Sequence, residues 1–482
     1  MLTPCLAVLA CTAMAAPAST VRAGGIEYVA PGTAALGRGG AFAARADDPM
    51  ALGYSPAALA DLAGPQLMLN LHNAFYSSCV KRDGAYGDQV EQLSALTDDF
   101  GDIADYGDTP FPRICNSNLL NPGAWLAFAY RPTSKLGVGV GVLTPAAAGH
   151  LIYGDGHGAT DDGELPSPLR YMMVEQKAIV LHPTLGAGYR VTDWLSVGLS
   201  LQAGIAVIEA QSMTLLNGSE NAAEDTRSNL AVKDLFVPAV IGSVQLTLHE
   251  GVELSVFGRW SDAIRAHGEV DADVKAFNES VAKSSSDDVS LTAPQPGHVG
   301  AAVRFADLHT PMDREHGKRP LHDERWDVEL DAVYVFASQM DAIEVDIPRL
   351  PNLIEDGLQF EMPHAWSDQL SLRLGGDYNL LPGKLALRTG VHYETSAVDG
   401  SYMAVAFQPA QRIGLHVGAT LRLGAVALSV AYAHIFQETV VVPMGAQAYP
   451  QVAKNDPVLV NAGTYDSGYD VVSLGVNVHL GG

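Results

Sequence analysis

The sequence predicts an all-β protein: a 14-stranded antiparallel transmembrane β-barrel with a small N-terminal segment plugging its lumen. Three observations predict it. Segments of about 10–14 residues alternate between apolar and polar or small residues, as membrane strands do. The connections between these segments alternate between short and long. No apolar run in the body of the chain reaches the ~18 residues of a spanning helix, and only helices and closed barrels satisfy every backbone polar group in lipid.

Composition and charge limit the alternatives. The chain has 482 residues, of which 48% are hydrophobic and 17% charged, which is too apolar for a disordered protein. A net charge of −25 argues against nucleic acid as a partner, because nothing would neutralise the phosphates. No linker divides the chain after its N-terminus. We therefore expect a signal peptide at 1–23, a plug at 24–64 and one barrel at 65–482.

The N-terminus has the pattern of an exported protein. A short apolar stretch from Cys5 to Ala16 precedes small residues, with cleavage patterns at Ala16-Pro17-Ala18 and, more loosely, at Val21-Arg22-Ala23, which indicates a secretory signal peptide. The basic residues that usually open such a peptide are missing. A weak lipoprotein pattern around Cys11 is the alternative.

Two cysteines remain after cleavage, Cys79 and Cys115. An even number of cysteines in an exported chain favours a disulfide, here one that closes an acidic external loop, with two free thiols as the alternative.

The segment from 24 to 64 is rich in glycine and alanine and too apolar for a free tail. We predict short helical turns at 47–51 and 56–61, the second with Ser55 as its N-cap and Pro56 at its first position. Such a compact piece would fold inside the barrel and block it.

The strands are predicted from period two. From Val472 to Leu480 every second residue is apolar, and small or polar residues lie between them. Fourteen such segments begin near Gln66, Ala124, Lys135, Tyr171, Leu195, Val237, Val252, His298, Trp326, Ala365, Lys384, Gln411, Ala425 and Tyr469.

The connections predict which end faces outward. Short turns occur at 132–134, 192–194, 249–251, 381–383 and 423–424, and long loops at 79–122, 153–170, 211–235, 267–295, 339–361, 396–410 and 439–467. Outer-membrane barrels have short periplasmic turns and long external loops. The connection 306–323 is long where a short one is expected.

Charged residues fall on the face of the strands that we assign to the lumen. They are Arg259, Arg304, Arg373, Arg388, Asp377 and Glu394, with Asp327, Glu329 and Asp331 beside them. On the lipid face a charge near the midplane costs about 2–4 kcal/mol. Two interpretations remain open: a polar lumen or a carboxylate-binding site within it, or mutual neutralisation across neighbouring strands.

Several motifs, in this order along the chain, resemble the FadL/TodX (OMPP1) family of outer-membrane transporters. They lie at 35–41, 47–48, 55–59, 136–145, 182–190, 194–198, 372–378 and 387–390. The first three resemble the family's N-terminal hatch and assign to it Gly37, Arg38, Gly39, Asp47, Asp48, Ser55, Pro56 and Ala57. The chain departs from the family where Ser55 replaces the usual asparagine, and where Leu480 replaces a terminal aromatic residue.

The resemblance also implies a kink in the third strand that opens sideways into the bilayer. Gly137, Gly139 and Gly141 fall on the inward face and leave room for a plug, and Pro145 lacks a ladder donor. The alternative is a bend in the sheet that opens nothing.

Other chemistry is less favoured. The acidic and histidine residues at 313–324 match no standard metal spacing, and the acidic first loop is expected to be solvated. The glycines at 137–141 precede no helix, so a phosphate loop is not expected. No serine–histidine arrangement stands out, so we expect no enzyme, no metal and no cofactor.

The resemblance implies passive transport of hydrophobic small molecules, with long-chain fatty acids as the first candidates. Loops 153–170 and 211–235 would capture the ligand with Leu165, Leu169, Leu215 and Leu216, before hatch movement and exit at the third strand. The expected partners are the ligand, outer-membrane lipid and lipopolysaccharide, and we expect a monomer in the bacterial outer membrane. The alternatives are a general porin for hydrophilic solutes, or a barrel lipase or adhesion protein.

Overall fold

The computed structural model describes residues 31–86, 108–144, 149–214, 222, 225–276, 279–311, 316–351, 353, 356–451 and 458–480. The predicted signal peptide, Pro145, Leu215 and Leu216 lie outside these ranges. Among the described residues, no helix is long and apolar enough to cross a membrane.

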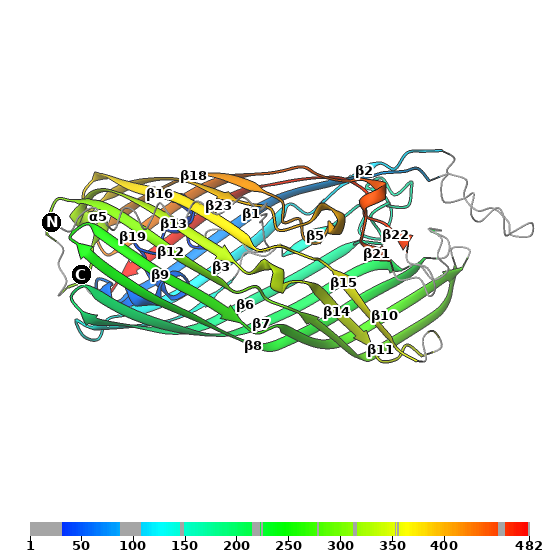
Figure 1. Ribbon diagram of the computed structural model, residues 1–482, viewed down its shortest axis with the longest axis horizontal. Coiled ribbons are helices and arrows are strands. Elements are labelled where there is room, and N and C mark those ends of the chain that lie inside the picture. Colours follow the sequence, from blue (N-terminus) through cyan, green and yellow to red (C-terminus); the bar gives the residue numbers. More distant parts are fainter. Residues whose placement is uncertain are drawn as a thin grey trace, which may run out of the picture.

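Fourteen antiparallel strands form a closed ring, as the sequence predicts (Figure 1). Each strand pairs with its neighbour along this series, and the last pairs with the first. In order they are β1 (Gln66–Arg82), β3 (Leu120–Tyr130), β4 (Leu136–Leu143), β6 (Glu175–Thr192), β7 (Leu195–Thr214), β8 (Thr226–His249), β9 (Val252–Ser261), β12 (His298–Leu308), β13 (Glu324–Val335), β16 (Gln369–Leu381), β17 (Leu385–Glu394), β18 (Arg412–Leu423), β19 (Val426–Gln437) and β23 (Gly463–His479).

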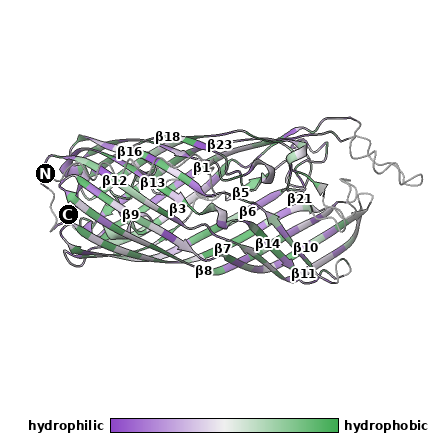
Figure 2. Ribbon diagram, viewed as in Figure 1, coloured by the Kyte–Doolittle hydropathy of each residue, from purple (hydrophilic) through white to green (hydrophobic). Residues whose placement is uncertain are grey.

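The two faces of the ring have opposite polarity. Along β18, Leu415 and Val417 are both 54% exposed on the outside, whereas Arg412 and His416 are buried inside. Figure 2 shows the same alternation of hydrophobic and hydrophilic residues along many strands. An apolar outer surface around a polar interior is the arrangement that lipid requires.

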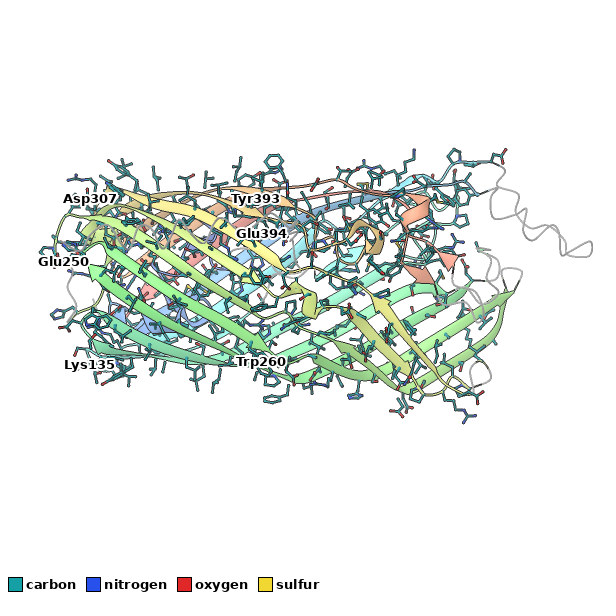
Figure 3. The ribbon with its side chains drawn as sticks, in the orientation of Figure 1. Lys135, Glu250, Trp260, Asp307, Tyr393 and Glu394 are labelled. Carbon is teal, nitrogen blue, oxygen red and sulfur yellow. A yellow bond between two sulfur atoms is a disulfide. The ribbon has the colours of Figure 1, made fainter. Side chains whose placement is uncertain are left out.

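An exposed tryptophan lies near the middle of the long axis of the molecule (Figure 3). Figure 3 shows Lys135, Glu250 and Asp307 at the end with the short turns, and Trp260 near the middle of the long axis. Trp260 is 56% exposed, and an exposed tryptophan is typical of a membrane interface. The strands beyond it therefore project outside the membrane.

Two predicted loops are wrong because they contain long additional strands, and a third, 211–235, is wrong from residue 226, where β8 begins. The loop at 267–295 is largely the hairpin of β10 (Ile264–Ala276) and β11 (Glu279–Ala293), and 339–361 contains β14 (Ala342–Ile347) and most of β15 (Leu358–Pro363). These strands continue the wall beyond the membrane, at the right of Figure 1. In β10 the apolar residues Val270 and Ala272 face inward and Asp271 outward, the reverse of a membrane strand.

The smaller elements lie in the connections. They are β2 (Arg113–Cys115), β5 (His150–Ile152), α5 (Pro320–Asp323), η2 (Ala337–Gln339), η3 (Gly400–Tyr402), β20 (Val440–Val442), η4 (Met444–Ala446), β21 (Pro450–Gln451) and β22 (Val458–Leu459). The long connection 306–323 reaches the N-terminal segment, because the Lys318 amide donates to the Asp61 carbonyl at 2.8 Å.

The N-terminal segment fills the lumen near the short turns. It contains α2 (Thr33–Gly37), α3 (Ala51–Tyr54) and η1 (Pro56–Asp61), and nearly all of its residues are buried. We call residues 33–62 the hatch. The helical turn predicted at 47–51 lies slightly later: its hydrogen bonds begin with the Asp48 carbonyl, and α3 begins at Ala51. Pro56 does open the second helix, but the Ser55 side chain does not cap it and contacts Ser255 Oγ at 3.1 Å instead.

Candidate functional site

The first half of the hatch is held by a buried cluster of charges. Arg38 forms a two-pronged contact with Asp327 at 2.9 and 2.8 Å and reaches Asp377 at 2.6 Å. Arg45 reaches Asp327 at 3.0 Å and Asp377 at 3.3 Å. These side chains are almost completely buried, and removing one partner of such a pair typically costs about 3–5 kcal/mol.

The backbone of the hatch takes part in the same cluster. The amide of Ala44 donates to Glu329 at 2.6 Å, and the amides of Phe42 and Ala43 donate to Asp331 at 3.2 and 3.3 Å. The barrel carboxylates therefore satisfy donors that a helix or sheet would otherwise satisfy. This arrangement fixes the hatch backbone as well as its arginines.

The second half of the hatch packs on glycines. A Cβ atom on Gly137, Gly188 or Gly198 would overlap with the backbone of residues 56–60. These glycines lie on three neighbouring strands, β4, β6 and β7. The Ala57 amide donates to Ser243 Oγ at 2.8 Å, which extends the seat to β8. Glycine here is required for close approach of two backbones.

An apolar cavity of about 610 Å³ extends from the hatch to the external strands. Its floor includes Met50, Gly53 and Tyr54 of the hatch. Its wall is formed mainly by apolar side chains from the extended part of the barrel, among them Met172, Ile264, Leu291, Ile343, Leu358 and Phe407. Such a space binds apolar molecules by removing their surface from water.

Basic side chains line the part of this cavity that is nearest to the hatch, which we call its lower end. Arg259 donates to Gln202 Oε1 at 2.9 Å and lies 3.3 Å from His182 Nε2. Arg373 donates to Ser371 Oγ at 3.1 Å, and no described carboxylate forms an ion pair with it. The apolar space therefore has a cationic group at its lower end.

The third strand of the ring is interrupted beside the cavity. β3 and β4 pair only over Leu126–Tyr130 and 138–142, and β4 ends at Leu143. Thr144 is held by its carbonyl, which accepts from Trp125 Nε1 at 2.6 Å. Leu143 and Thr144 line the cavity, so the cavity reaches the end of β4.

The other side of this interruption is held by asparagine side chains. The amide of Ile152 donates to Asn116 Oδ1 at 2.9 Å, and the amide of His150 donates to Asn121 Oδ1 at 2.9 Å. Asn118 donates from Nδ2 to the His150 carbonyl at 3.1 Å. Side chains thus replace part of the strand pairing that β4 does not provide.

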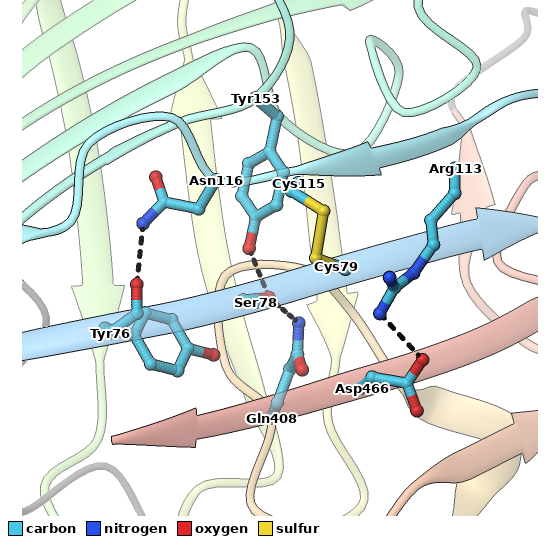
Figure 4. The surroundings of a disulfide bond; sticks show 9 residues. All are labelled: Tyr76, Ser78, Cys79, Arg113, Cys115, Asn116, Tyr153, Gln408 and Asp466. Atoms are coloured by element: carbon cyan, nitrogen blue, oxygen red, sulfur yellow. Dashed lines mark hydrogen bonds and ion pairs between the residues drawn. A yellow bond between two sulfur atoms is a disulfide. The ribbon is translucent and has the colours of Figure 1, made fainter. Parts of the chain in front are cut away.

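Cys79 and Cys115 form a disulfide between β1 and β2 (Figure 4). Asn116 follows directly, and its Nδ2 donates to the Tyr76 carbonyl at 3.3 Å. Ser78 Oγ lies 2.7 Å from the Tyr153 hydroxyl and accepts from Gln408 at 2.7 Å. The disulfide therefore joins β1 to β2, and Asn116 beside it contacts Ile152 and Tyr153.

The lumen residues predicted from the sequence form two groups. Arg304, Arg388 and Asp377 belong to the charge cluster of the hatch, whereas Arg259, Arg373 and Glu394 line the cavity. Cross-strand pairs do occur, as between Arg412 and Glu394 at 2.6 Å. The principal partners of the cluster nevertheless come from the hatch.

The hatch residues predicted from the sequence each make a different contact. Gly37 ends α2 against Gly418, and Gly39 has a φ of 66° that suits glycine. Asp47 pairs with Arg45 at 3.1 Å, and Asp48 accepts the Met50 amide at 2.8 Å. Arg38, Ser55, Pro56 and Ala57 lie in the contacts given above.

Three residues that take part in the contacts of the hatch and its surroundings were not predicted from the sequence. Arg45 lies between Ala44 and Ala46 without a motif, and Lys318, which pairs with Glu253, lies in a connection. Thr33 contacts Asn70 and Ser473 at 2.7 Å each. Of the predicted capture residues, Leu169 is completely buried, so it is not an exposed ligand surface.

Two acidic residues of the hatch have shifted pKa values. Burial and the neighbouring charge of Asp47 raise the pKa of Asp48 to about 7. Burial acts in the same direction on Asp47, but the charge and hydrogen bond of Arg45 outweigh it and lower the pKa of Asp47. The hatch thus contains one carboxyl that changes charge near neutral pH.

Solved structures with the same architecture are distant in sequence. A FadL homologue from Pseudomonas aeruginosa is 13% identical, with a TM-score of 0.71 over 94% of this chain and 99% of that one. The toluene transporter TodX from P. putida is 13% identical, with a TM-score of 0.65 over 94% and 98%. The toluene transporter TbuX from Ralstonia pickettii is 15% identical, with a TM-score of 0.59 over 93% and 99%. No curated protein sequence matches the chain.

The family is shown by a match to nearly the whole chain. Residues 13–462 match the family described as outer membrane protein transport protein (OMPP1/FadL/TodX). The predicted family, barrel and location are thereby confirmed. The chain belongs to the OMPP1/FadL/TodX family, and it is an outer-membrane transport protein for hydrophobic compounds rather than an enzyme.

Proposed function

We propose that the protein carries long-chain fatty acids passively through the outer membrane. The observation that supports this best is the apolar cavity with Arg373 at its lower end. A fatty acid combines a long apolar chain with one carboxylate. The cavity wall would bury the chain, and the guanidinium would donate charge-assisted hydrogen bonds to the carboxylate.

The proposed route leaves the barrel sideways. The hatch blocks the lumen below the cavity, whereas Leu143 and Thr144 line the cavity at the interrupted strand. A ligand that passes there enters the bilayer without crossing the charge cluster. Gly137, Gly139 and Gly141 keep this strand close to the hatch and the neighbouring strand, while Pro145 lies outside the described residues. Partition into the bilayer supplies the direction, so no energy source is needed.

A neutral aromatic ligand is the second candidate. The relatives TodX and TbuX are toluene transporters, and CymD is a monoaromatic hydrocarbon channel. A neutral ligand would use the apolar wall without the arginine. The two candidates therefore differ in their dependence on Arg373.

Uptake measurements distinguish these candidates. In a host without its own transporter, Arg373→Gln should lower fatty acid uptake about tenfold, since a hydrogen bond to a charged group contributes roughly 1.5–3 kcal/mol. Uptake of toluene should stay unchanged. The control is Arg325→Gln, which removes an exposed arginine paired with Asp307 at 3.3 Å. Uptake of toluene but not fatty acids by the unaltered protein would contradict the fatty acid assignment.

A purified sample tests the ligand directly. Mass spectrometry of lipids that co-purify with the detergent-extracted protein should detect fatty acids, and the Arg373→Gln protein should retain fewer. A large, steady aqueous current through single channels would instead support an open porin.

A further inference from the structure

The hatch is anchored at both ends by different means. Residues 33–47 are held by Thr33 and by the buried cluster around Arg38 and Arg45. Residues 55–61 are held by Ser55, by the Ala57 amide and by the glycine seat of β4, β6 and β7. Asp61 adds an ion pair with Arg190.

The residues between these anchors have no comparable hold. Asp48 accepts the Met50 amide at 2.8 Å, and the Tyr54 hydroxyl donates to the Pro31 carbonyl at 3.0 Å. The remaining hydrogen bonds of residues 48–54 lie within the turn and α3. Among the described residues, none of these bonds reaches a barrel strand. We call residues 48–54 the finger.

The finger lies between the cavity and the interrupted strand. Met50, Gly53 and Tyr54 line the cavity floor. The Leu52 side chain faces Gly139 of β4, where an added Cβ would lie 3.2 Å from Leu52 Cδ2. It also faces Gly186 of β6, which leaves no room for a Cβ beside it. A Cβ on Gly53 would lie 3.2 Å from Leu143 Cδ1.

We propose that the finger is the moving part of the hatch, and that both anchors stay in place during transport. This inference rests on the proposed sideways route and assigns its gate to seven residues, 48–54. A ligand that reaches the cavity floor displaces Met50 and Tyr54. Leu52 then leaves the space beside Gly139 and Gly186, and the path along Leu143 opens.

Movement of the finger breaks apolar contacts but, among the described residues, no ion pair or hydrogen bond to a barrel strand. The finger is held by apolar packing against β1, β3 and β4 and by hydrogen bonds that reach no described barrel strand, whereas moving either anchor would require separating buried ion pairs or hydrogen bonds to the barrel. A whole-hatch movement would break all of them together. The finger is therefore the part that binding energy can displace most easily.

Cysteine pairs test this inference in the full-length protein. The pair G53C/L143C joins the finger to β4, T33C/S473C joins the first anchor to β23, and S55C/S255C joins the second anchor to β9. The two anchor pairs are the controls. Their native side-chain oxygens lie 2.7 Å apart in Thr33 and Ser473 and 3.1 Å apart in Ser55 and Ser255. Each pair is bridged with a short thiol cross-linker or by oxidation, and peptide mass spectrometry measures the extent of bridging.

We expect the bridge at G53C/L143C to lower uptake of a labelled fatty acid about tenfold or more, with recovery on reduction of an oxidised bridge. Both anchor bridges should leave uptake within about twofold of the unaltered protein. Reductant is also applied to the unaltered protein, since it contains Cys79–Cys115.

The opposite pattern overturns the inference. Loss of uptake on bridging either anchor would show that the anchors move, and normal uptake with the finger bridged would show that the finger does not. If the unaltered protein takes up neither fatty acid nor toluene, the proposed function fails as well, which separates the two failures.

Discussion

At the residue scale, Gly137 illustrates a position where the absence of a side chain matters. A Cβ there would overlap with the Leu59 carbonyl, which is backbone and cannot rotate away. Gly242 on β8 is a matched control, because a Cβ there meets no atom within 4 Å.

We predict that Gly137→Ala displaces η1 and destabilises the hatch by about 1–3 kcal/mol, the usual cost of overpacking. Gly242→Ala should have no measurable effect. Limited proteolysis within residues 33–62, compared with the intact barrel, measures the difference. Equal protection of the hatch in both variants would contradict the proposed glycine seat.

Asp48 gives the finger a dependence on pH. Its pKa in the folded protein, about 7, lies above the ordinary value of 3.8, so folding favours the neutral carboxyl. The seated finger is therefore most stable below the ordinary pKa and loses stability as the pH rises toward 7. The charged groups that act on Asp48 are Asp47, Arg45 and Arg388.

We predict that the amides of residues 50–54 exchange hydrogen faster as the pH rises from about 5 to about 7, after correction for intrinsic exchange. Asp48→Asn removes the titrating group and should flatten this dependence. Hydrogen exchange with mass spectrometry measures both proteins. A dependence in the variant as steep as in the parent would assign the effect to another group.

At the element scale, the disulfide between β1 and β2 stabilises the far side of the interrupted strand. It closes a separation of 36 residues, and a loop of this length corresponds to about 3–4 kcal/mol of unfolded-state entropy. The segment 149–153 depends on Asn116, which follows Cys115 directly.

We predict that replacing both cysteines with serine increases hydrogen exchange in 149–153 and leaves the strands near the short turns unchanged. Barrel stability in denaturant should fall by less than the loop entropy, because the ring of strands remains. Unchanged exchange in 149–153 would mean that its asparagine contacts need no support from the disulfide.

The strands of the ring could be predicted because lipid imposes one rule on all of them. Predicted starts such as Gln66, Leu195 and Val252 agree with the observed ones, since an apolar outer face is obligatory there. β10 and β11 were missed because the wall outside the membrane has water on its outer face. In these strands the apolar residues therefore face inward and the polar residues outward, the opposite of the strands in the membrane.

The site could be predicted only in part. Inward charges follow from strand alternation, but their partners do not, because Arg38 meets Asp327 across 289 residues of sequence. Gly139 was recognised as space for a plug, yet nothing local identifies Leu52 as the side chain beside it. Contacts between a hatch and a distant wall depend on the closed ring, which no short segment encodes.

At the scale of the whole molecule, the protein combines a rigid plug with a long apolar vestibule. The charge cluster and the glycine seat lie near the short turns, and the cavity lies toward the external strands. Polar solutes meet a blocked lumen, while apolar ones gain free energy on entering the vestibule. Selection by polarity therefore needs no narrow pore.

The place of Thr33 has a consequence for biogenesis. Its hydroxyl contacts Asn70 on β1 and Ser473 on β23, the first and last strands of the ring. These strands become neighbours only when the C-terminal strand has been made and paired. A chain without β23 consequently cannot form the Ser473 contact, and the start of the hatch keeps only its partner on β1. The first residue of the hatch is thus fully held only once the polypeptide has been completed.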